Sequence, residues 1–579
     1  MPADLPREDF EPLFEPQAYS RDDEWQLRPF FTNLDRSVYV PLIFSPEVIG
    51  ALCSRTSRAA DDLRMVFLRE YLAPFLEPQQ GPKETEDEWR DRLQYGAEVD
   101  ALIRFLHEHP LETMFSNPRA RSFYVKWLAQ YGDDSIAQMA GTHLVFGSLS
   151  QVAIKHFEDQ RIGLAPIEKS TRYVNYAEKI RGHYRYYTDP TLAVLGLADA
   201  YRSAMDHAFA TYEQLLPRLT AWLHERFPNE KLSVVEKKAF DTLRGLLPMA
   251  TLSQVSFYGN GQAFEYLINR ASRHHLGEIR WAAERAYEEL SLVIPSLLRR
   301  IKNPDSADLV RNYQDYLAGH STRMEPLARA PAMQVGKHPD AAMTVNLVEY
   351  DPEGQEKILA GLLYEATENH APWTEMLNRV RAMSPSEQRA VLDAGLAGRT
   401  ERWQKVPRAF EHAYVRFEIV MNIGAWRDLH RHRMLTQQRQ MFSCRHGYDI
   451  PEDVVAAGLD REFREAVERV AEIHERIAAK DPYLAQYAVT LAHRVRFLQW
   501  ENLRQCFWEM ELRTIPEGHP DYRAIEQAKF RCLEKAYPLI AERMRVNLGS
   551  YDFARRGQEE KIQARLRELS AVRASRPSP

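Results

Sequence analysis

The feature that most constrains the fold of this chain is a long-range repeat in the order of its segments. In the first half, an alternating stretch at residues 141–150 leads to a helical pattern, a polar stretch, a turn at Asp189-Pro190 and a long amphipathic helix. The second half repeats this order from the alternating stretch at residues 412–422 through the turn at Ile450-Pro451. Alternation predicts a half-buried strand, and apolar residues spaced by three and four predict a helix. Two similar units in tandem explain the order, and the alternative is coincidence among helix-rich segments.

The length of the chain also requires more than one core. It has 579 residues, whereas a single hydrophobic core stops growing at roughly 250–300 residues. Helical periodicity dominates, and a stretch rich in Pro, Gly, Ser and charge after a long helix indicates a boundary. We therefore predict a helix-rich α+β protein with an arm at 1–44, a first domain at 45–302, a linker at 303–344, a second domain at 345–553 and a charged, solvated tail at 554–579.

Charge and composition exclude several classes of protein. The 76 basic and 82 acidic residues give a net charge of -6, which argues against nonspecific binding of nucleic acid. The sequence has neither an apolar N-terminal segment nor an uninterrupted apolar window of about 18 residues, so we expect a cytoplasmic protein without a membrane partner. Its four cysteines form no CxxC pair, and we predict neither a disulfide framework nor a metal site.

The densest cationic cluster comprises Arg427, Arg431, His432 and Arg433. If a helix continues through them, Arg427 and Arg431 are four residues apart and project from one face. Such a face suits a polyanion, because guanidinium groups bind phosphate oxygens in pairs. The alternative interpretation is a solvated helix end with salt bridges.

A second cluster lies in the first half, where Glu168, Ser170 and Arg172 alternate. In an extended backbone these side chains point the same way and suit a phosphoester or a sugar. The alternative is a surface strand with a Glu–Arg pair.

Other chemistry is less well supported. His274 and His275 have no third ligand at metal-binding spacing, so helix-end or core histidines are the favoured interpretation. Cys506 lies in an apolar, aromatic context that raises rather than lowers the pKa of a thiol. The sequence contains no glycine-rich phosphate loop, so any nucleotide site must use side chains.

The second-half cluster resembles the signature RHRxxSxxxxSxR of flavin-dependent thymidylate synthases. Arg431, His432 and Arg433 take the RHR positions, and Thr436 replaces the first serine. Where the family has a glutamate and a second serine, this chain has Arg439 and Met441, unless a two-residue insertion lets Ser443 and Arg445 form the SxR pair. Five further residues fall where the family places flavin and nucleotide ligands: Glu411 in an FEH segment, Asn502, Arg504, Arg513 and His519.

The first half resembles the other end of the same signature. Its segment IEKSTRY supplies Glu168, Ser170 and Arg172, and LRGLLP aligns Arg244 with an arginine that binds the substrate phosphate. Arg270 aligns with the arginine near the uracil ring. The remaining family positions are lost: RHR becomes Glu158, Asp159 and Gln160, and a nearby Asn and Arg become Gly259 and Gly261.

This resemblance implies two thymidylate synthase complementing protein-like domains, each an antiparallel sheet flanked by helices. It also implies an enzyme that methylates dUMP to dTMP with FAD as cofactor and methylenetetrahydrofolate and NADPH as co-substrates. The implied catalytic residue is Arg513. The implied substrate-binding residues are Glu168, Ser170, Arg172, Arg244, Arg270, Arg427 and Arg431, and the implied cofactor-binding residues are Glu411, Arg431, His432, Arg433, Asn502, Arg504 and His519.

The losses in the two halves are complementary, which predicts one hybrid site built from unlike halves. The family forms homotetramers, so the resemblance implies a homodimer of fused chains. Two other functions remain open. One is a catalytically degenerate protein that still binds flavin or nucleotide, and the other is a nucleic-acid-associated protein, which the net acidity disfavours.

Overall fold

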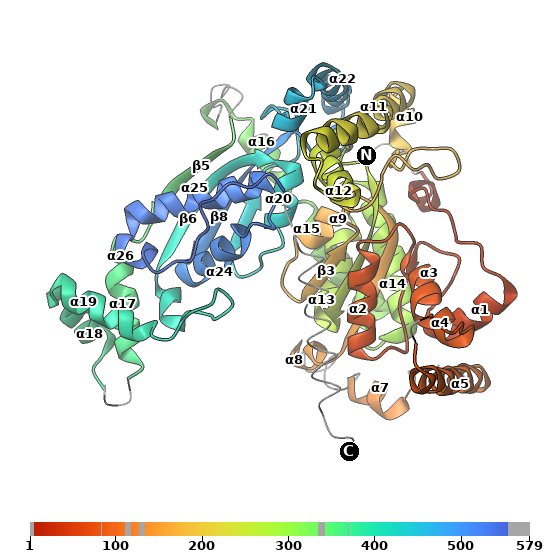
Figure 1. Cartoon of the computed structure of the whole chain (residues 1–579), viewed down its shortest axis with the longest axis horizontal. Helices are drawn as coiled ribbons and strands as arrows, with labels where there is room; N and C mark the ends of the chain where they lie inside the picture. Colours follow the sequence, from red (N-terminus) through yellow and green to blue (C-terminus); the bar gives the residue numbers. More distant parts are fainter. Residues whose placement is uncertain are drawn as a thin grey trace. The chain divides into compact units, whose positions relative to one another are not determined.

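The computed structural model describes residues 5–82, 84–109, 117–124, 126, 134–333, 342–366, 368 and 370–553 (Figure 1). Its described residues form two antiparallel four-stranded sheets with the same strand order, β1-β2-β4-β3 and β5-β6-β8-β7. The strands are β1 Val38–Tyr39, β2 Gly141–Ser150, β3 Leu164–Glu168, β4 Leu252–Asn260, β5 Thr344–Tyr350, β6 Tyr414–Asn422, β7 Thr436–Arg439 and β8 Arg494–Asn502. The shared order confirms the predicted tandem duplication and the α+β class.

In each half, two strands run directly into a helix through a capping residue. Ser150 and Asn422 cap the helices α9 and α20, and Asn260 and Asn502 cap α13 and α24. Each of these side chains accepts a bond from the backbone N–H three residues later, which satisfies one of the open donors of the first turn. The four caps therefore define equivalent positions in the two halves.

The helices account for most of the remaining chain. Before β5 they are α1 Arg21–Leu27, α2 Pro46–Thr56, α3 Leu63–Val66, α4 Ala73–Leu76, α5 Glu86–Glu108, α7 Pro118–Tyr124, α8 Asp134–Gln138, α9 Gln151–Glu158, α10 Thr191–Val194, α11 Ala198–Arg226, α12 Leu232–Leu243, α13 Gly261–Ala271, α14 Gly277–Val293, α15 Ala307–Ala318 and α16 His320–Ala328. After β5 they are α17 Gly354–Tyr364, α18 Trp373–Ala382, α19 Pro385–Gly395, α20 Ile423–Leu429, α21 Glu452–Ala456, α22 Asp460–Ala478, α23 Pro482–Ala485, α24 Leu503–Arg513, α25 Pro520–Ala536 and α26 Pro538–Ala541.

The two sequence halves are interwoven rather than strictly consecutive. One compact unit comprises Met1–Trp222, Ala239–His338 and Ile450–Leu491, and the other comprises Leu223–Lys238, Pro339–Asp449 and Ala492–Pro579. The first unit therefore contains α22, which belongs to the second half of the sequence. Within this unit the equivalent segments before β4 and β8 pair with each other, since Met249 N–H donates to Val489 O at 2.7 Å and Leu491 N–H to Leu247 O at 2.9 Å.

The two sheets differ in what covers one of their faces. On the first sheet, a hydrophobic cluster from the N-terminal arm and α2–α5 packs against Val145 of β2 and Ile167 of β3. The arm itself adds β1 to the sheet edge. On the second sheet, the register places Leu498 opposite Glu418, just as Ser256 lies opposite Val145 in the first sheet. Leu498 is 39% exposed, so this part of the second face is open.

Three sequence-based expectations concern segments outside the two sheets. The segment predicted as a linker contains α15 and α16, and residues 334–341 within it lie outside the described part. The charged tail at 554–579 also lies outside the described residues. Among the helices that the structure describes, none has the length and apolar character needed to cross a bilayer.

Candidate functional site

The second unit contains a strongly basic cavity of about 390 Å³. Four segments line it: the loop at residues 399–406, the short 3-10 helix Arg408–His412, the turn at 431–434 and α24 with its N-cap. Its lining residues are Arg399, Arg402, Gln404, Lys405, Val406, Glu411, Arg431, His432, Arg433, Met434, Asn502, Arg504, Gln505, Phe507, Trp508, Leu512 and Arg513. Seven of these are Lys or Arg and one is a carboxylate, so the cavity suits a polyanionic ligand.

Seven residues that the sequence assigns to a site come together in this cavity: Glu411, Arg431, His432, Arg433, Asn502, Arg504 and Arg513. Arg427 and His519 do not line it. Arg427 is buried in α20, and His519 is the N-cap of α25, where its side chain accepts a bond from Asp521 N–H.

The predicted common face of Arg427 and Arg431 is wrong, because α20 ends at Leu429. The chain then tightens into a turn in which His432 N–H donates to Leu429 O at 3.1 Å. This turn buries His432 and leaves Arg431 and Arg433 exposed at the cavity, while Arg427 stays in the interior. The structure therefore separates two arginines that helical spacing would have placed together.

Some arginines of the cavity are held by carboxylates. Arg504 Nη1 donates to Glu411 Oε1 at 2.8 Å, and Arg399 Nη2 lies 2.6 Å from Glu511 Oε2. The side chains of Arg399 and Glu511 are almost fully buried, which makes this pair part of the scaffold. Glu411 is thus a residue that orients an arginine, and the carboxylate is not itself suited to a phosphate.

His432 and Arg513 form a pair at the end of α24. Arg513 Nε donates to His432 Nε2 at 2.8 Å. Burial lowers the pKa of His432 to about 4, so the ring is neutral near pH 7. Because Nε2 accepts, the single ring proton lies on Nδ1, the nitrogen that faces Gln505 at 3.2 Å.

Several lining residues were missed by the sequence prediction. Arg402 and Lys405 belong to a basic loop just before the FEH segment. Their closeness to that segment in the sequence could have indicated that they line the same site. Phe507 and Trp508 also line the cavity, and Trp508 is 38% exposed. Gln505 carried no signal by itself, because its role depends on neighbours from other elements.

In the first unit, Arg172 and Arg244 lie on either side of one carboxylate. Arg172 Nη2 is 2.7 Å and Arg244 Nη1 is 3.2 Å from the two oxygens of Asp241. All three side chains are nearly buried. Two guanidinium groups against one carboxylate leave a local positive charge, which suits a phosphate. Ser170 adjoins this pair, since its Oγ accepts from Arg172 N–H at 3.3 Å.

Glu168 does not share a face with Ser170 and Arg172. Strand β3 ends at Glu168, and the chain then turns, with Tyr173 N–H donating to Ser170 O at 3.2 Å. Glu168 instead lies 2.9 Å from the ammonium group of Lys155 in a buried cluster with Glu158. The extended arrangement that the alternation predicted is therefore wrong beyond β3.

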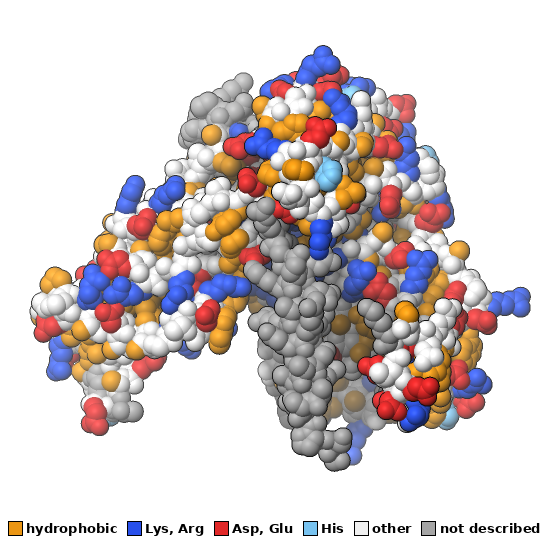
Figure 2. Space-filling model, viewed as in Figure 1, with side chains coloured by type: hydrophobic (Ala, Val, Ile, Leu, Met, Phe, Trp, Pro, Cys, Tyr) orange, Lys and Arg blue, Asp and Glu red, His pale blue; other side chains and the backbone are white. Residues whose placement is uncertain are grey.

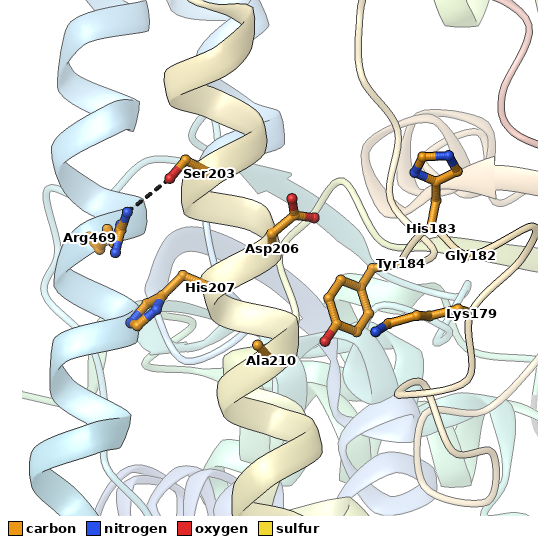
Figure 3. A pocket seen from close by; sticks show the side chains of 9 residues that line it. All are labelled: Lys179, Gly182, His183, Tyr184, Ser203, Asp206, His207, Ala210 and Arg469. Carbon is orange, nitrogen blue, oxygen red and sulfur yellow. Dashed lines mark hydrogen bonds between the residues drawn. The ribbon is translucent and has the colours of Figure 1, made fainter.

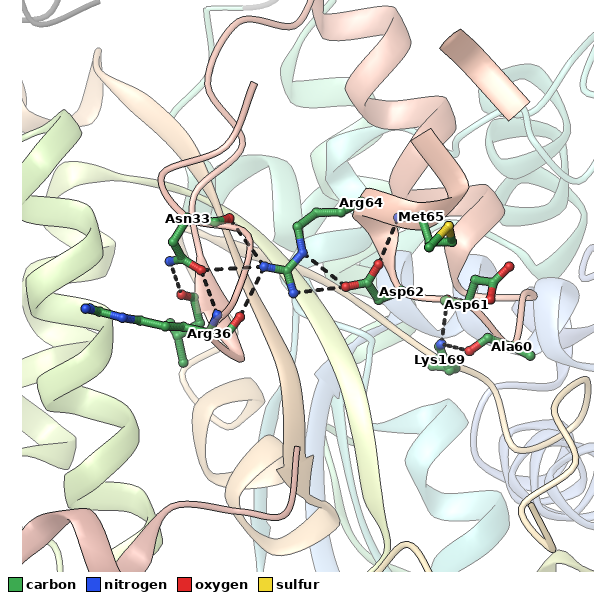
Figure 4. A network of polar contacts seen from close by, with 9 residues as sticks. Asn33, Arg36, Ala60, Asp61, Asp62, Arg64, Met65 and Lys169 are labelled. Carbon is green, nitrogen blue, oxygen red and sulfur yellow. Dashed lines mark hydrogen bonds and ion pairs between the residues drawn. The ribbon is translucent and has the colours of Figure 1, made fainter. Parts of the chain in front are cut away.

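The turn that carries Ser170 is braced by the loop before α3 (Figure 4). Lys169 Nζ donates to the carbonyl oxygens of Ala60 and Asp61, each at 2.8 Å. Burial lowers the pKa of Lys169 to about 8. In the same network Arg64 Nη2 lies 3.0 Å from Asp62 Oδ2. The N-terminal segment thus helps to fix the turn that carries Ser170.

Arg270 does not occupy the position equivalent to Arg513. Counted from the N-caps Asn260 and Asn502, that position is Ala271, and the Arg270 guanidinium donates to His156 O. The same count, from Ser150 and Asn422, makes Asp159, Gln160 and Arg161 the equivalents of Arg431, His432 and Arg433. Each of these structural equivalents lies one residue away from the position that the family resemblance gave in the sequence.

A second depression, of about 410 Å³, lies between α11, α22 and the turn at residues 179–184 (Figure 3). Its cations have local partners: Arg469 Nη2 donates to Ser203 Oγ at 2.9 Å, and Lys179 Nζ lies 3.9 Å from Glu213. None of the residues assigned from sequence lines it. On the face drawn in Figure 2, basic and acidic side chains are mixed, without a continuous basic surface.

The histidines considered as metal ligands have other partners. His275 Nε2 lies 2.7 Å from Asp481 Oδ2, and His274 Nδ1 accepts from Leu276 N–H. In the part of the chain that the structure describes, no group of three or more His, Cys, Asp or Glu side chains is arranged to hold a metal ion.

Comparison with known proteins agrees with the duplicated architecture. The family model described as thymidylate synthase complementing protein matches residues 89–296 and again residues 346–539. A UPF0159 protein of Chlamydia muridarum (strain MoPn / Nigg) is 33% identical over 523 residues, covering 88% of this chain and 92% of that protein. A UPF0159 protein of Thermoplasma acidophilum is 28% identical over 544 residues, covering 88% and 97%.

Among solved structures, the crystal structure of the UMP/dUMP methylase PolB from Streptomyces cacaoi bound with 5-Br dUMP aligns with 35% of this chain and 95% of that chain, at 15% identity and a TM-score of 0.28. The two matches of the family model cover most of the chain, and each includes strands of one of its two sheets. This chain therefore belongs to the thymidylate synthase complementing protein family, in a tandemly duplicated form.

Proposed function

We propose that this protein is an FAD-dependent thymidylate synthase that methylates dUMP to dTMP, with methylenetetrahydrofolate and NADPH as co-substrates. The observation that carries the proposal is that seven residues assigned from the family resemblance line one basic cavity. Those residues come from segments almost a hundred positions apart in the sequence, and only the fold brings them together. Membership of the family supports the same activity.

The residues of the cavity fit a flavin dinucleotide. Arg431 and Arg433, with Lys405 beside them, provide cations for a diphosphate, and Phe507 and Trp508 provide aromatic surface for a ring system. When bound, FAD would supply the redox equivalents of the reaction. The protein's own contribution is orientation and charge, because the cavity contains no thiol nucleophile.

Arg513 is the proposed catalytic residue. His432 engages its Nε, so the two Nη atoms remain to stabilise negative charge on a ligand oxygen. Glu411 and the Val406 carbonyl oxygen similarly hold Arg504, through its Nη1 and Nε atoms, which leaves Nη2 for the ligand.

The dUMP phosphate is proposed to bind at Arg172 and Arg244. A phosphate would compete with Asp241 for the same two guanidinium groups, so Asp241→Asn should strengthen dUMP binding while Arg244→Ala weakens it. Isothermal titration with dUMP measures both. Equal affinities in all three proteins would contradict this assignment.

In this proposal each half supplies a different part of the site, the phosphate ligands from the first half and the flavin ligands from the second. Co-expression of Arg244→Ala and Arg433→Ala chains provides a test. If sites form from unlike halves of different chains, the two defective chains restore activity together. If each site uses one chain only, they do not.

Complementation of a thymidine-requiring strain tests the activity. Growth should depend on the wild-type chain and fail with Arg513→Ala at equal expression. A second candidate, a degenerate protein that binds flavin without turnover, is favoured by one observation: Glu168 contacts Lys155 in the interior instead of facing the phosphate site. A yellow protein that fails to complement would support this second candidate, and a colourless protein after reconstitution with FAD would contradict both.

A further inference from the structure

A buried group of four ionisable side chains lies behind the cavity. Glu501 comes from β8, Glu509 from α24, and Glu526 and Lys529 from α25, and all four side chains are 0% exposed. Lys529 Nζ lies 2.9 Å from Glu501, 3.1 Å from Glu526 and 3.4 Å from Glu509. Burying ions is expensive, so a cluster of this kind calls for a specific role.

The cluster has one ammonium group and three carboxyl groups. Its net charge is zero when two of the carboxyl groups are protonated. Burial raises the pKa of Glu501 and of Glu526. Burial also opposes ionisation of Glu509, but the Lys529 ammonium outweighs it and holds the pKa of this carboxyl below its usual range. Of the three carboxyl groups, Glu509 is therefore the one that ionises most readily beside the Lys529 ammonium.

Glu509 connects this cluster to the cavity. Gln505, Glu509 and Arg513 are spaced by four on α24 and so share one face of the helix. The Gln505 amide lies 3.4 Å from Glu509 Oε2 and 3.2 Å from His432 Nδ1. Both contacts are made by the same atom, Gln505 Nε2, which donates to Glu509 and lies against the His432 ring.

The contacts that lead from Glu509 through Gln505 to His432 end at Arg513, because His432 Nε2 accepts a hydrogen bond from Arg513 Nε. Gln499 fixes Glu509 from the other side, since its Nε2 donates to Glu509 Oε2 at 2.9 Å. A flexible arginine is thus held through neutral groups by a carboxylate that the solvent does not reach.

We propose that the buried carboxylate of Glu509 positions Arg513 for anion binding, acting through Gln505 and His432. Glu509 does not contact the cavity and is a positioning residue, whereas Arg513 is the group that meets the ligand. The inference rests on the proposed function only in taking the cavity to be an anion site.

The sign of the effect separates positioning from simple electrostatics. A carboxylate near an anion site repels the anion, so its removal should strengthen anion binding if charge alone matters. If Glu509 positions Arg513, its removal should weaken binding, because the arginine loses its fixed orientation. Glu509→Gln therefore gives opposite results under the two explanations.

The test measures inorganic pyrophosphate binding to the full chain by isothermal titration near pH 7. We expect Glu509→Gln to weaken binding about tenfold, which corresponds to about 1.4 kcal/mol. Lys529 keeps Glu501 as a carboxyl partner in this variant, so the fold should persist. Gln505→Met removes the contacts of Gln505 with Glu509 and His432 without changing any charge. It should also weaken pyrophosphate binding.

Glu526→Gln is the matched control, because an amide closely replaces a carboxyl group that is already neutral. It should bind pyrophosphate like the wild type. In an Arg513→Ala background, Glu509→Gln should cause no further loss, since the residue on which it acts is missing.

Three outcomes would overturn the inference. They are unchanged or stronger binding in Glu509→Gln, an equal loss in the Arg513→Ala background, and a loss in Glu526→Gln as large as that in Glu509→Gln. Absence of any effect of Arg513→Ala and Arg433→Ala on pyrophosphate would overturn the cavity assignment as well. A normal Arg513→Ala effect with no Glu509→Gln effect rejects the inference alone.

Discussion

The position occupied by His432 and Arg513 in the second half can be compared directly with its counterpart in the first. Counted from the shared N-caps, the second half has His432, Gln505, Glu509 and Arg513, whereas the first half has Gln160, Ala263, Leu267 and Ala271. In the first half Gln160 Nε2 donates to the Ala263 carbonyl at 2.8 Å. The polar row is thus replaced by small and apolar residues and one backbone contact.

Packing closes the same region of the first half. A Cβ on Gly261 would lie 2.6 Å from Leu297, and one on Gly259 would lie 2.6 Å from Leu164. These contacts are shorter than van der Waals contact, so a side chain at either glycine would require Leu297 or Leu164 to move. At this position the second half places polar side chains beside a basic cavity, whereas the first half has small and apolar residues.

Each half nevertheless buries one lysine among carboxyl groups, on different elements. In the first half Lys155 of α9 lies between Glu158 and Glu168, and in the second Lys529 of α25 contacts three glutamates. The buried lysine clusters of the two halves therefore lie on different elements of the repeated fold.

The largest expected effect is the loss of either buried lysine. Lys529→Met leaves the ionised Glu509 without its main cation, and Lys155→Met does the same to the carboxyl groups of the first half. Each change should lower the free energy of unfolding by about 3–5 kcal/mol. Urea unfolding followed by circular dichroism measures this. If only one variant is destabilised, the two clusters are not equivalent in their structural role.

The next effect concerns the contact of Glu278 with Tyr487, which joins α14 to a segment from the second half of the sequence within the first unit. Burial raises the pKa of Glu278 to about 7, although Ser150 and the Tyr487 hydroxyl donate to its carboxyl group. The folded state therefore keeps a proton that the unfolded chain releases above about pH 4.5. Stability is fully present below this pH and declines as the pH rises through about 7, by roughly 3 kcal/mol in total.

Urea unfolding of the wild type and Glu278→Gln at about pH 5 and about pH 8 checks this sign. The amide cannot ionise, so the difference in stability between wild type and variant should change across this range. Nearby Asp189, whose pKa burial also raises, remains in both proteins and cancels in the comparison. A constant difference would show that Glu278 does not titrate there.

The sequence predicted the duplicated fold well, because strand alternation at residues 141–150 and 412–422 is a local signal. It failed at Arg427 and Arg431, because the end of α20 is set by the burial of His432 against α24. The buried cluster escaped prediction for a similar reason. Glu509 and Lys529 are not neighbours in sequence, and only the packing of α24 on α25 brings them together.

A smaller effect is expected from the cations at the cavity itself. If Arg433 binds a flavin phosphate as proposed, Arg433→Ala removes one charge-assisted contact and should weaken FAD binding by about 1.5–3 kcal/mol, which is roughly 10- to 100-fold. Flavin fluorescence quenching measures this affinity. The matched change in the first half is Arg161→Gly, since Arg161 has a φ of 54°, which glycine adopts without strain. It should leave the affinity unchanged, and a comparable loss would mean that the first half also contributes flavin ligands.

The smallest effect is expected on the open face of the second sheet. Leu498 is 39% exposed, whereas Val145 of β2, on the face covered by the N-terminal segment, is 0% exposed. Leu498→Ala should lower the free energy of unfolding by about 1 kcal/mol, less than at a core leucine, because Leu498 is already 39% exposed to water. Val145→Ala should cost about 2 kcal/mol through lost burial and a cavity. Urea unfolding compares the two. If Leu498→Ala costs as much as Val145→Ala, this face is covered in solution, and the contrast between the two sheets would disappear.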